Sequence, residues 1–127
     1  MNINKLVVGS MFSMLLGSEM AAADWGDVYY CQMTNILTIT LEGEKESYKL
    51  GKFQFKLDQT KNAMVFGSSG HFANSVDELT TGRSFPIQEK WYANDKHSMT
   101  YFSKGRFLFT SMSLFDIESI SADCEKF

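Results

Sequence analysis

The chain has 127 residues and a formal net charge of −3, and aromatic residues make up 14% of it. This apolar and aromatic content is too high for a disordered chain, and the mildly acidic charge argues against general nucleic-acid binding, which needs a strongly basic surface. We therefore expect a folded protein with no nucleic-acid partner.

Residues 1–23 have the pattern of a secretory signal peptide. Lys5 precedes an apolar run over 6–16, and Ala21-Ala22-Ala23 supplies the small residues of a cleavage site. We expect cleavage before Asp24, so that 24–127 is a single β domain, exported to the periplasm or secreted. The apolar run is shorter than the roughly 20 residues that span a bilayer, so the mature chain is expected to lack a transmembrane segment.

The first part of the domain alternates apolar and polar residues, which predicts strands over 28–33 and 37–41. A polar turn centred on Gly43 follows. The stretch 48–58 is also strand-like, but its apolar residues change phase at Gly51-Lys52. Such a switch predicts a β-bulge or a bend at that point.

The rest of the domain is expected to consist of short strands joined by tight turns. A short helix is a candidate only over 75–81, because Ser75 and Glu78 have the spacing of a capping box. Asn94-Asp95 and Lys104-Gly105 are expected turns. Strands are expected over 63–66, 84–87, 89–93, 98–103, 106–113 and 117–124.

The two cysteines, Cys31 and Cys124, lie near the two ends of the expected domain. In an oxidising compartment such a pair predicts a disulfide, here between the first and last strands. The fold class is therefore expected to be all-β: a small antiparallel meander closed as a barrel or a sandwich. A barrel is favoured because the bridge would then lie at its seam.

Several expected strands are apolar on both sides, and neighbouring residues of a strand point to opposite faces. Trp91-Tyr92 is one such pair, and Tyr101-Phe102 is another. Because a small barrel has one interior, some of these rings must lie outside. We therefore expect Trp91 and Tyr92 to mark an aromatic contact surface.

The loop candidate is Gly67-Ser68-Ser69-Gly70-His71. A nucleophile elbow needs glycine where His71 stands, followed by a helix, and a phosphate-binding P-loop needs a Gly-Lys pair. Turn chemistry explains the glycines and serines. Ser68, Ser69 and His71 are kept as binding candidates, and Ser69 with His71, or a carboxylate, as the basis of a hydrolase alternative.

No metal or cofactor is expected. The chain has two histidines, His71 and His97, too few for a histidine-rich zinc site. Glu42, Glu44 and Glu46 lack the spacing of a calcium loop. They are interpreted as a solvated hairpin tip.

The layout resembles the bacterial inhibitors of c-type lysozyme, which are small exported β-barrels. Tyr29-Tyr30-Cys31 and Ala122-Asp123-Cys124 occupy the places of that family's opening and closing cysteine stretches, and 68–72 is similar to its lysozyme-contacting loop, one residue shorter. The resemblance implies that Ser68 and Ser69 are contact residues. The family's Trp…Lys-Gly stretch is absent, because Trp91 is followed by Tyr92-Ala93.

The stretches "FKLDQTKNAMVFG" and "WYAND" resemble those of small exported bacterial proteins of unknown function. Together these observations predict an exported, non-enzymatic binding module whose partner is a protein or an envelope glycan. The contact would be the aromatic surface or the Gly/Ser loop. The alternatives are an inhibitor of c-type lysozyme and a small hydrolase.

Overall fold

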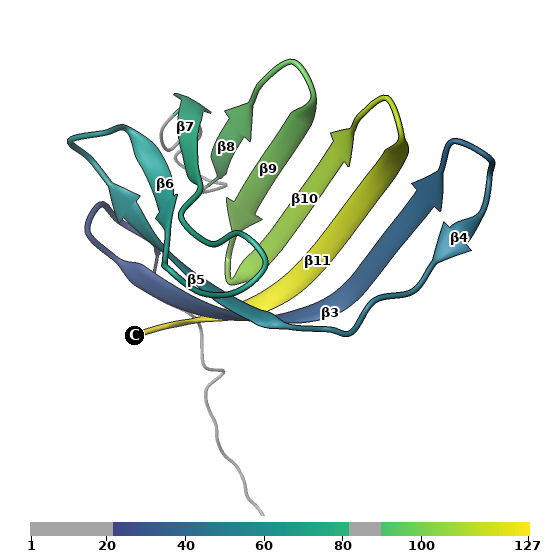
Figure 1. Cartoon of the computed structure of the whole chain (residues 1–127). Coiled ribbons are helices and arrows are strands. Elements are labelled where there is room, and N and C mark those ends of the chain that lie inside the picture. The colour runs from purple at the N-terminus through teal and green to yellow at the C-terminus, as the bar shows by residue number, and fades with distance from the viewer. Residues whose placement is uncertain (1–21, 82–89) are drawn as a thin grey trace, which may run out of the picture.

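The structure is a computed structural model that describes residues 22–81 and 90–127. Every regular element in these ranges is a β-strand, and all the pairs are antiparallel (Figure 1). The strands are β3 (Val28–Thr40), β4 (Lys45–Glu46), β5 (Lys52–Asp58), β6 (Ala63–Phe66), β7 (Val76–Thr81), β8 (Trp91–Asn94), β9 (Ser98–Ser103), β10 (Arg106–Met112) and β11 (Asp116–Lys126).

Eight of these strands form a closed barrel. The order β3-β5-β6-β7-β8-β9-β10-β11 is completed by pairing of β11 with β3, and β4 adds to the far half of β3. The closing ladder is long, from Asp116 opposite Thr40 to Lys126 opposite Tyr29. The expected all-β meander is therefore confirmed, and it is a barrel and not a sandwich.

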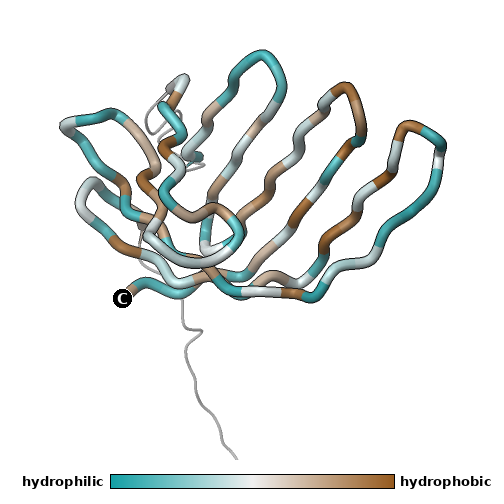
Figure 2. Tube along the Cα trace, viewed as in Figure 1, coloured by the Kyte–Doolittle hydropathy of each residue, from teal (hydrophilic) through white to brown (hydrophobic). Residues whose placement is uncertain are grey.

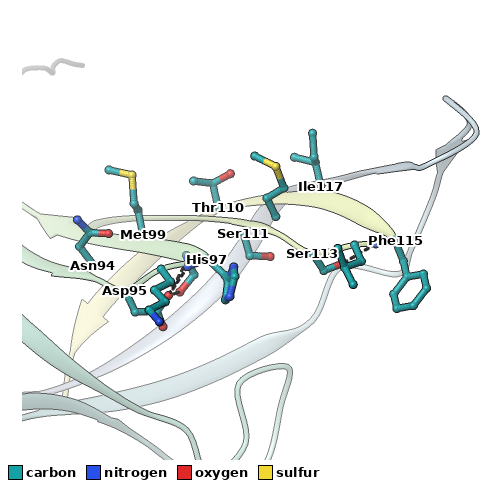
Figure 3. Close-up of a pocket in the computed structure, with 13 residues that line it drawn as sticks. Asn94, Asp95, His97, Met99, Thr110, Ser111, Ser113, Phe115 and Ile117 are labelled. Carbon is teal, nitrogen blue, oxygen red and sulfur yellow. Dashed lines mark hydrogen bonds between the residues drawn. The ribbon is translucent and has the colours of Figure 1, made fainter.

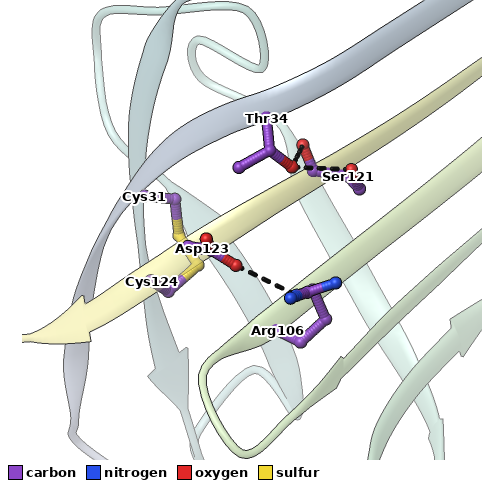
Figure 4. The surroundings of a disulfide bond; sticks show 6 residues. All are labelled: Cys31, Thr34, Arg106, Ser121, Asp123 and Cys124. Carbon is purple, nitrogen blue, oxygen red and sulfur yellow. Dashed lines mark hydrogen bonds and ion pairs between the residues drawn. A yellow bond between two sulfur atoms is a disulfide. The ribbon is translucent and has the colours of Figure 1, made fainter.

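The predicted disulfide is confirmed and lies on this closing ladder. Cys31 and Cys124 are direct cross-strand partners with Cα atoms 4.0 Å apart and an S–S distance of 2.06 Å. Figure 4 shows the bridge where β3 crosses β11, close to an ion pair between Arg106 Nε and Asp123 Oδ1 (3.0 Å). One covalent bond thus joins the strands that begin and end the barrel.

Aromatic rings fill the barrel interior. The Tyr29 ring lies 4.7 Å from that of Phe102 and 5.6 Å from that of Phe55, and Phe55 meets Phe102 at 5.1 Å. Each of these three side chains is at most 1% exposed. The period-2 pattern of the sequence, with Phe53, Phe55 and Leu57 on one side of β5, therefore places these side chains in the core.

The prediction of a short helix over 75–81 is wrong, because Val76–Thr81 is strand β7. Asp77 and Glu78 of this strand lie opposite Met64 and Ala63 of β6, and Leu79 is buried in the core. A capping box stabilises only the first turn of a helix. Burial and ladder pairing outweigh that local signal here.

Of the β-bulge or bend expected at Gly51-Lys52, the β-bulge is not found, since the β3–β5 ladder has no register shift. Strand β5 begins at Lys52, so the change of phase marks a strand boundary. Register shifts occur instead on the β7–β8 ladder, between Leu79 and Thr81, and on the closing ladder, where Thr34 is the extra residue between the Met33 and Asn35 pairings. Its hydroxyl is 2.8 Å from that of Ser121, as Figure 4 shows.

The two strands expected over 28–33 and 37–41 are one continuous strand, β3, and the strand expected over 48–58 begins at Lys52. The later boundaries agree with the sequence pattern within a few residues. The Lys104-Gly105 turn is confirmed, with φ of 51° and 79°, the paired positive values that a two-residue hairpin needs. The strand expected over 89–93 lies at Trp91–Asn94. The strand expected over 84–87 lies outside the described residues.

Most of the expected signal peptide also lies outside the described residues. Ala23, the last residue of the expected signal peptide, is buried against the barrel core, together with the partly buried ring of Trp25. The proposed cleavage point before Asp24 stays a prediction. Among residues 22–81 and 90–127, no helix has the length and apolarity to cross a membrane.

We expect the Cys31→Ala/Cys124→Ala variant to lose about 4 kcal/mol of unfolding free energy, because the bridge closes a loop with a sequence separation of 93. Urea unfolding of the variant and the parent measures the difference. The matched control is Thr34→Ala, which removes an exposed side chain from the same ladder and should cost about 1 kcal/mol or less. A double variant as stable as the parent would contradict the conclusion that the disulfide stabilises the pairing of β3 with β11.

Candidate functional site

The barrel is closed along only part of its length. Strand β5 pairs with Val28–Gln32 of β3, whereas farther along β3 the partner is the two-residue strand β4, at Thr38 and Ile39. Figure 1 shows β3, β11 and β10 spreading away from β5 and β6 towards this end. We call it the flared end.

Polarity is inverted at the flared end. Deeper in the barrel, the residues that face the core are apolar. At the flared end, the residues on that same face are polar: Thr38 of β3, Glu118 of β11 and Ser111 of β10. These three residues are direct cross-strand partners. The outward residues on either side of them are mostly apolar, apart from Thr110 and Ser119, whose hydroxyl oxygens are 3.1 Å apart. A barrel wall in water normally has its apolar side inside, so this part of the sheet is reversed.

The outward side carries an exposed apolar surface, which we call the outer apolar face. Met112 lies opposite Ile117, and Ile117 opposite Ile39, so the surface is continuous across three strands. In Figure 3, Met99, Thr110 and Ile117 point to one side of the sheet and Ser111 to the other. The outer apolar face consists of Leu37 (39% exposed), Ile39 (38%), Met99 (44%), Leu108 (43%), Met112 (60%) and Ile117 (43%).

Two of the turns at this end also contain apolar residues (Figure 2). Leu41, Leu114 and Phe115 are 74%, 83% and 74% exposed, and the Leu41 amide donates to the Phe115 carbonyl at 2.8 Å, which joins the β3–β4 and β10–β11 turns. An open pocket of about 980 Å³ lies between the β8–β9 and β10–β11 turns (Figure 3). Met99, Met112 and Phe115 are among its lining residues.

The expected contact residues Trp91 and Tyr92 point to opposite faces. Trp91 is 0% exposed, and the Trp25 ring packs edge-on against it at 4.9 Å. The expectation that Trp91 lies on a contact surface is therefore wrong. Tyr92 is half-buried on the outside, opposite Tyr101, which in turn lies opposite Leu108. Tyr92 thus continues the line of the outer apolar face.

The three loop candidates lie on the β6–β7 connection, which crosses the concave face of the sheet (Figure 1). Ser68, Ser69 and His71 are exposed. Phe72 anchors the loop in the core, with its ring 4.9 Å from that of Phe53 and 5.0 Å from that of Phe109. The serines are therefore held at the surface by a buried neighbour.

His71 faces a carboxylate and not a serine. Its Nε2 atom lies 3.3 Å from Glu118 Oε1 on β11. Within the described residues, neither Ser68 nor Ser69 is hydrogen-bonded to the His71 ring. The hydrolase alternative requires a base within hydrogen-bond reach of its nucleophile, and this loop does not present that pair.

Two further carboxylates near the flared end have shifted pKa values. Burial raises the pKa of Asp77 above its usual value, and the Thr100 hydroxyl, donating at 2.9 Å, partly offsets this. Hydrogen bonds from the backbone amides of His97 and Ser98 lower the pKa of Asp95. Asp95 thereby closes the β8–β9 turn, where the sequence predicted a turn.

The sequence did not single out the outer apolar face. Its only signal was that several strands are apolar in both phases, and this was attributed to aromatic pairs. The residues that form the face are aliphatic and methionine side chains on β3, β9, β10 and β11. Comparisons with protein-family models, with curated proteins and with solved structures found no match to this chain.

We expect Trp91→Ala to lower the free energy of unfolding by about 3–5 kcal/mol, because it removes the large buried indole from the core. The matched change Tyr92→Ala, on the outer side of the same strand, should cost about 1 kcal/mol or less. Thermal and urea unfolding of both variants measure this. Equal losses for the two variants would contradict the assignment of their faces.

Proposed function

We propose that this protein is an exported, non-enzymatic binding module, and that the outer apolar face is where it binds another protein. The observation that carries the proposal is the six large apolar side chains that remain exposed on the outside of adjoining strands. Their exposed area is roughly 500 Å², at the upper end of the largest patch on a typical monomer, which is often functional.

The exposed area of the outer apolar face is also close to the apolar area that one partner contributes to a standard protein interface. Such an interface covers about 800 Å² per partner, of which a little over half is apolar. Methionine contributes to the face at Met99 and Met112, and its flexible side chain adapts readily to a partner surface. The half-buried Tyr92 and Tyr101 rings extend the same face with the amphipathic side chains that interfaces favour.

The shape of the face favours a different protein over a second copy. It lies on the outside of a barrel and is therefore convex, so two copies would meet as convex against convex and cover little of it. The charges beside it are of both signs, with Lys45 opposite Ile39 and Glu42 and Glu44 in the next turn. A partner with a concave apolar groove and a polar rim fits these features best.

To test this, a photo-crosslinking benzoylphenylalanine replaces Met112 in the cells that produce the protein, and replaces Val76 as the control. Val76 is also an exposed apolar residue (53%), but it lies on β7. We expect one discrete adduct with a different protein from position 112 and none from position 76. An adduct of twice the chain's own mass, or the same adducts from both positions, would contradict the proposal.

The identified partner is then tested with purified proteins. We expect Ile117→Lys to weaken its binding at least about tenfold, because the interface would bury an unpaired ammonium group. Val76→Lys makes the same chemical change away from the face and should alter binding less than about twofold. Circular dichroism confirms that both variants are folded.

Inhibition of c-type lysozyme is a second candidate, supported by the exposure of Ser68 and Ser69 on a loop anchored through Phe72. We expect purified protein to slow cell-wall lysis by c-type lysozyme, and Ser68→Ala/Ser69→Ala to weaken this effect. Thr60→Ala is the control, because Thr60 is an exposed hydroxyl in the neighbouring β5–β6 turn. An unchanged lysis rate with the parent protein would rule this candidate out.

A further inference from the structure

The concave face of the flared end carries a row of polar side chains on the side opposite the outer apolar face. Glu46 of β4, Thr38 of β3 and Glu118 of β11 are direct cross-strand partners in that order. Directly opposed residues of adjacent strands point to the same face, with Cβ atoms about 5 Å apart. We call these three residues the carboxylate row.

Thr38, at the centre of the row, has an unsatisfied hydroxyl. The residue is 1% exposed, and its Oγ1 has no hydrogen-bond partner among the described residues. A buried polar atom without a partner costs about 1–3 kcal/mol. Packing alone therefore does not explain why a threonine hydroxyl lies buried between the two carboxylates.

Negative charge is concentrated around Thr38. The Tyr48 hydroxyl donates to Glu46 Oε1 at 2.5 Å. The pKa of Tyr48 is raised, first by this hydrogen bond, then by partial desolvation and by the charges of Glu46, Asp116 and Glu118. On the ladder, Glu118 lies opposite Thr38, and Asp116 lies opposite Thr40 on the same face.

Little positive charge offsets them. The ion pairs of Lys or Arg within the described residues join Arg106 to Asp123 and Lys126 to Asp27, and none involves Glu46, Asp116 or Glu118. His71 is the basic group at the row, through Glu118.

We infer that the carboxylate row binds an organic cation, a primary ammonium or guanidinium group. The two carboxylates supply the charge, and Thr38 Oγ1 supplies a neutral acceptor between them, so several N–H donors of one cation can be bonded at once. The strand spacing separates the backbones of Glu46 and Glu118 by about 10 Å. This span suits a cation with several donors, either a free polyamine or the Lys side chain of a bound peptide.

The test is a titration of the full-length mature protein, followed by backbone amide NMR shifts. One arm uses spermidine, and a second uses the peptide acetyl-Gly-Lys-Gly-amide with its Nζ-acetylated form as the control. We expect shifts centred on Thr38, Glu46 and Glu118. Binding of spermidine alone identifies a free polyamine as the ligand, and binding of the peptide alone identifies a protein side chain.

The variants distinguish a site from general attraction of cations to an acidic protein. We expect Glu118→Gln and Thr38→Val each to weaken binding at least about tenfold, since hydrogen bonds to a charged group contribute more than neutral ones. Thr38→Val should fold at least as stably as the parent, because it removes an unpartnered buried hydroxyl. Glu78→Gln, at an exposed carboxylate on β7, is the matched control and should change nothing.

The inference is overturned if KCl of equal ionic strength or 1,4-butanediol produces the same shifts as spermidine. It is also overturned if Glu78→Gln weakens binding as much as Glu118→Gln, because the effect would then be one of net charge. Binding at the outer apolar face is measured separately and lies on the opposite side of the sheet. Failure of one proposal therefore leaves the other intact.

Discussion

The pairing of β11 with β3 is the constraint on which the rest of the structure depends. It joins strands from the two ends of the domain over a long ladder, and the Cys31–Cys124 bridge fixes its register covalently. A one-residue slip would turn every core-facing side chain of β11 outward. The bridge forbids that slip, and it limits the conformations open to the unfolded chain.

The length of β3 explains why the two ends of the barrel differ. Its first half is paired on both sides, by β5 and β11, and there the ring is complete around a packed aromatic core. Its second half continues past the end of β5, with β4 as its short neighbour. Strand β5 does not pair with that half, and its inward side carries Thr38 beside Glu118 in place of the core aromatic residues. The same strands keep apolar residues on the outward side, where the barrel gives them nothing to contact.

The flared end therefore offers two surfaces of different chemistry on one sheet. The convex side carries the outer apolar face, and the concave side carries the carboxylate row. The β6–β7 loop marks the boundary between the packed core and the concave face, because Phe72 is inserted into the core while the adjacent His71 contacts Glu118. Both surfaces are built on strands and not on flexible loops, so their side chains are held in fixed positions relative to one another.

The amino-acid sequence by itself determined the all-β fold class, most strand positions and the Lys104-Gly105 turn, because period-2 alternation and tight-turn residues are local properties of the chain. It also determined the disulfide pairing, because Cys31 and Cys124 are the two cysteines of the chain. It also placed Ser68 and Ser69 on an exposed loop. It could not determine which face of a two-sided apolar strand is buried, so Trp91 was expected outside and Met112 was overlooked. Nor could it reveal that Glu118, distant in the sequence from Thr38 and Glu46, lies in one row with them. Those facts depend on strand register and on where the barrel stops being closed, and long-range pairing alone decides both.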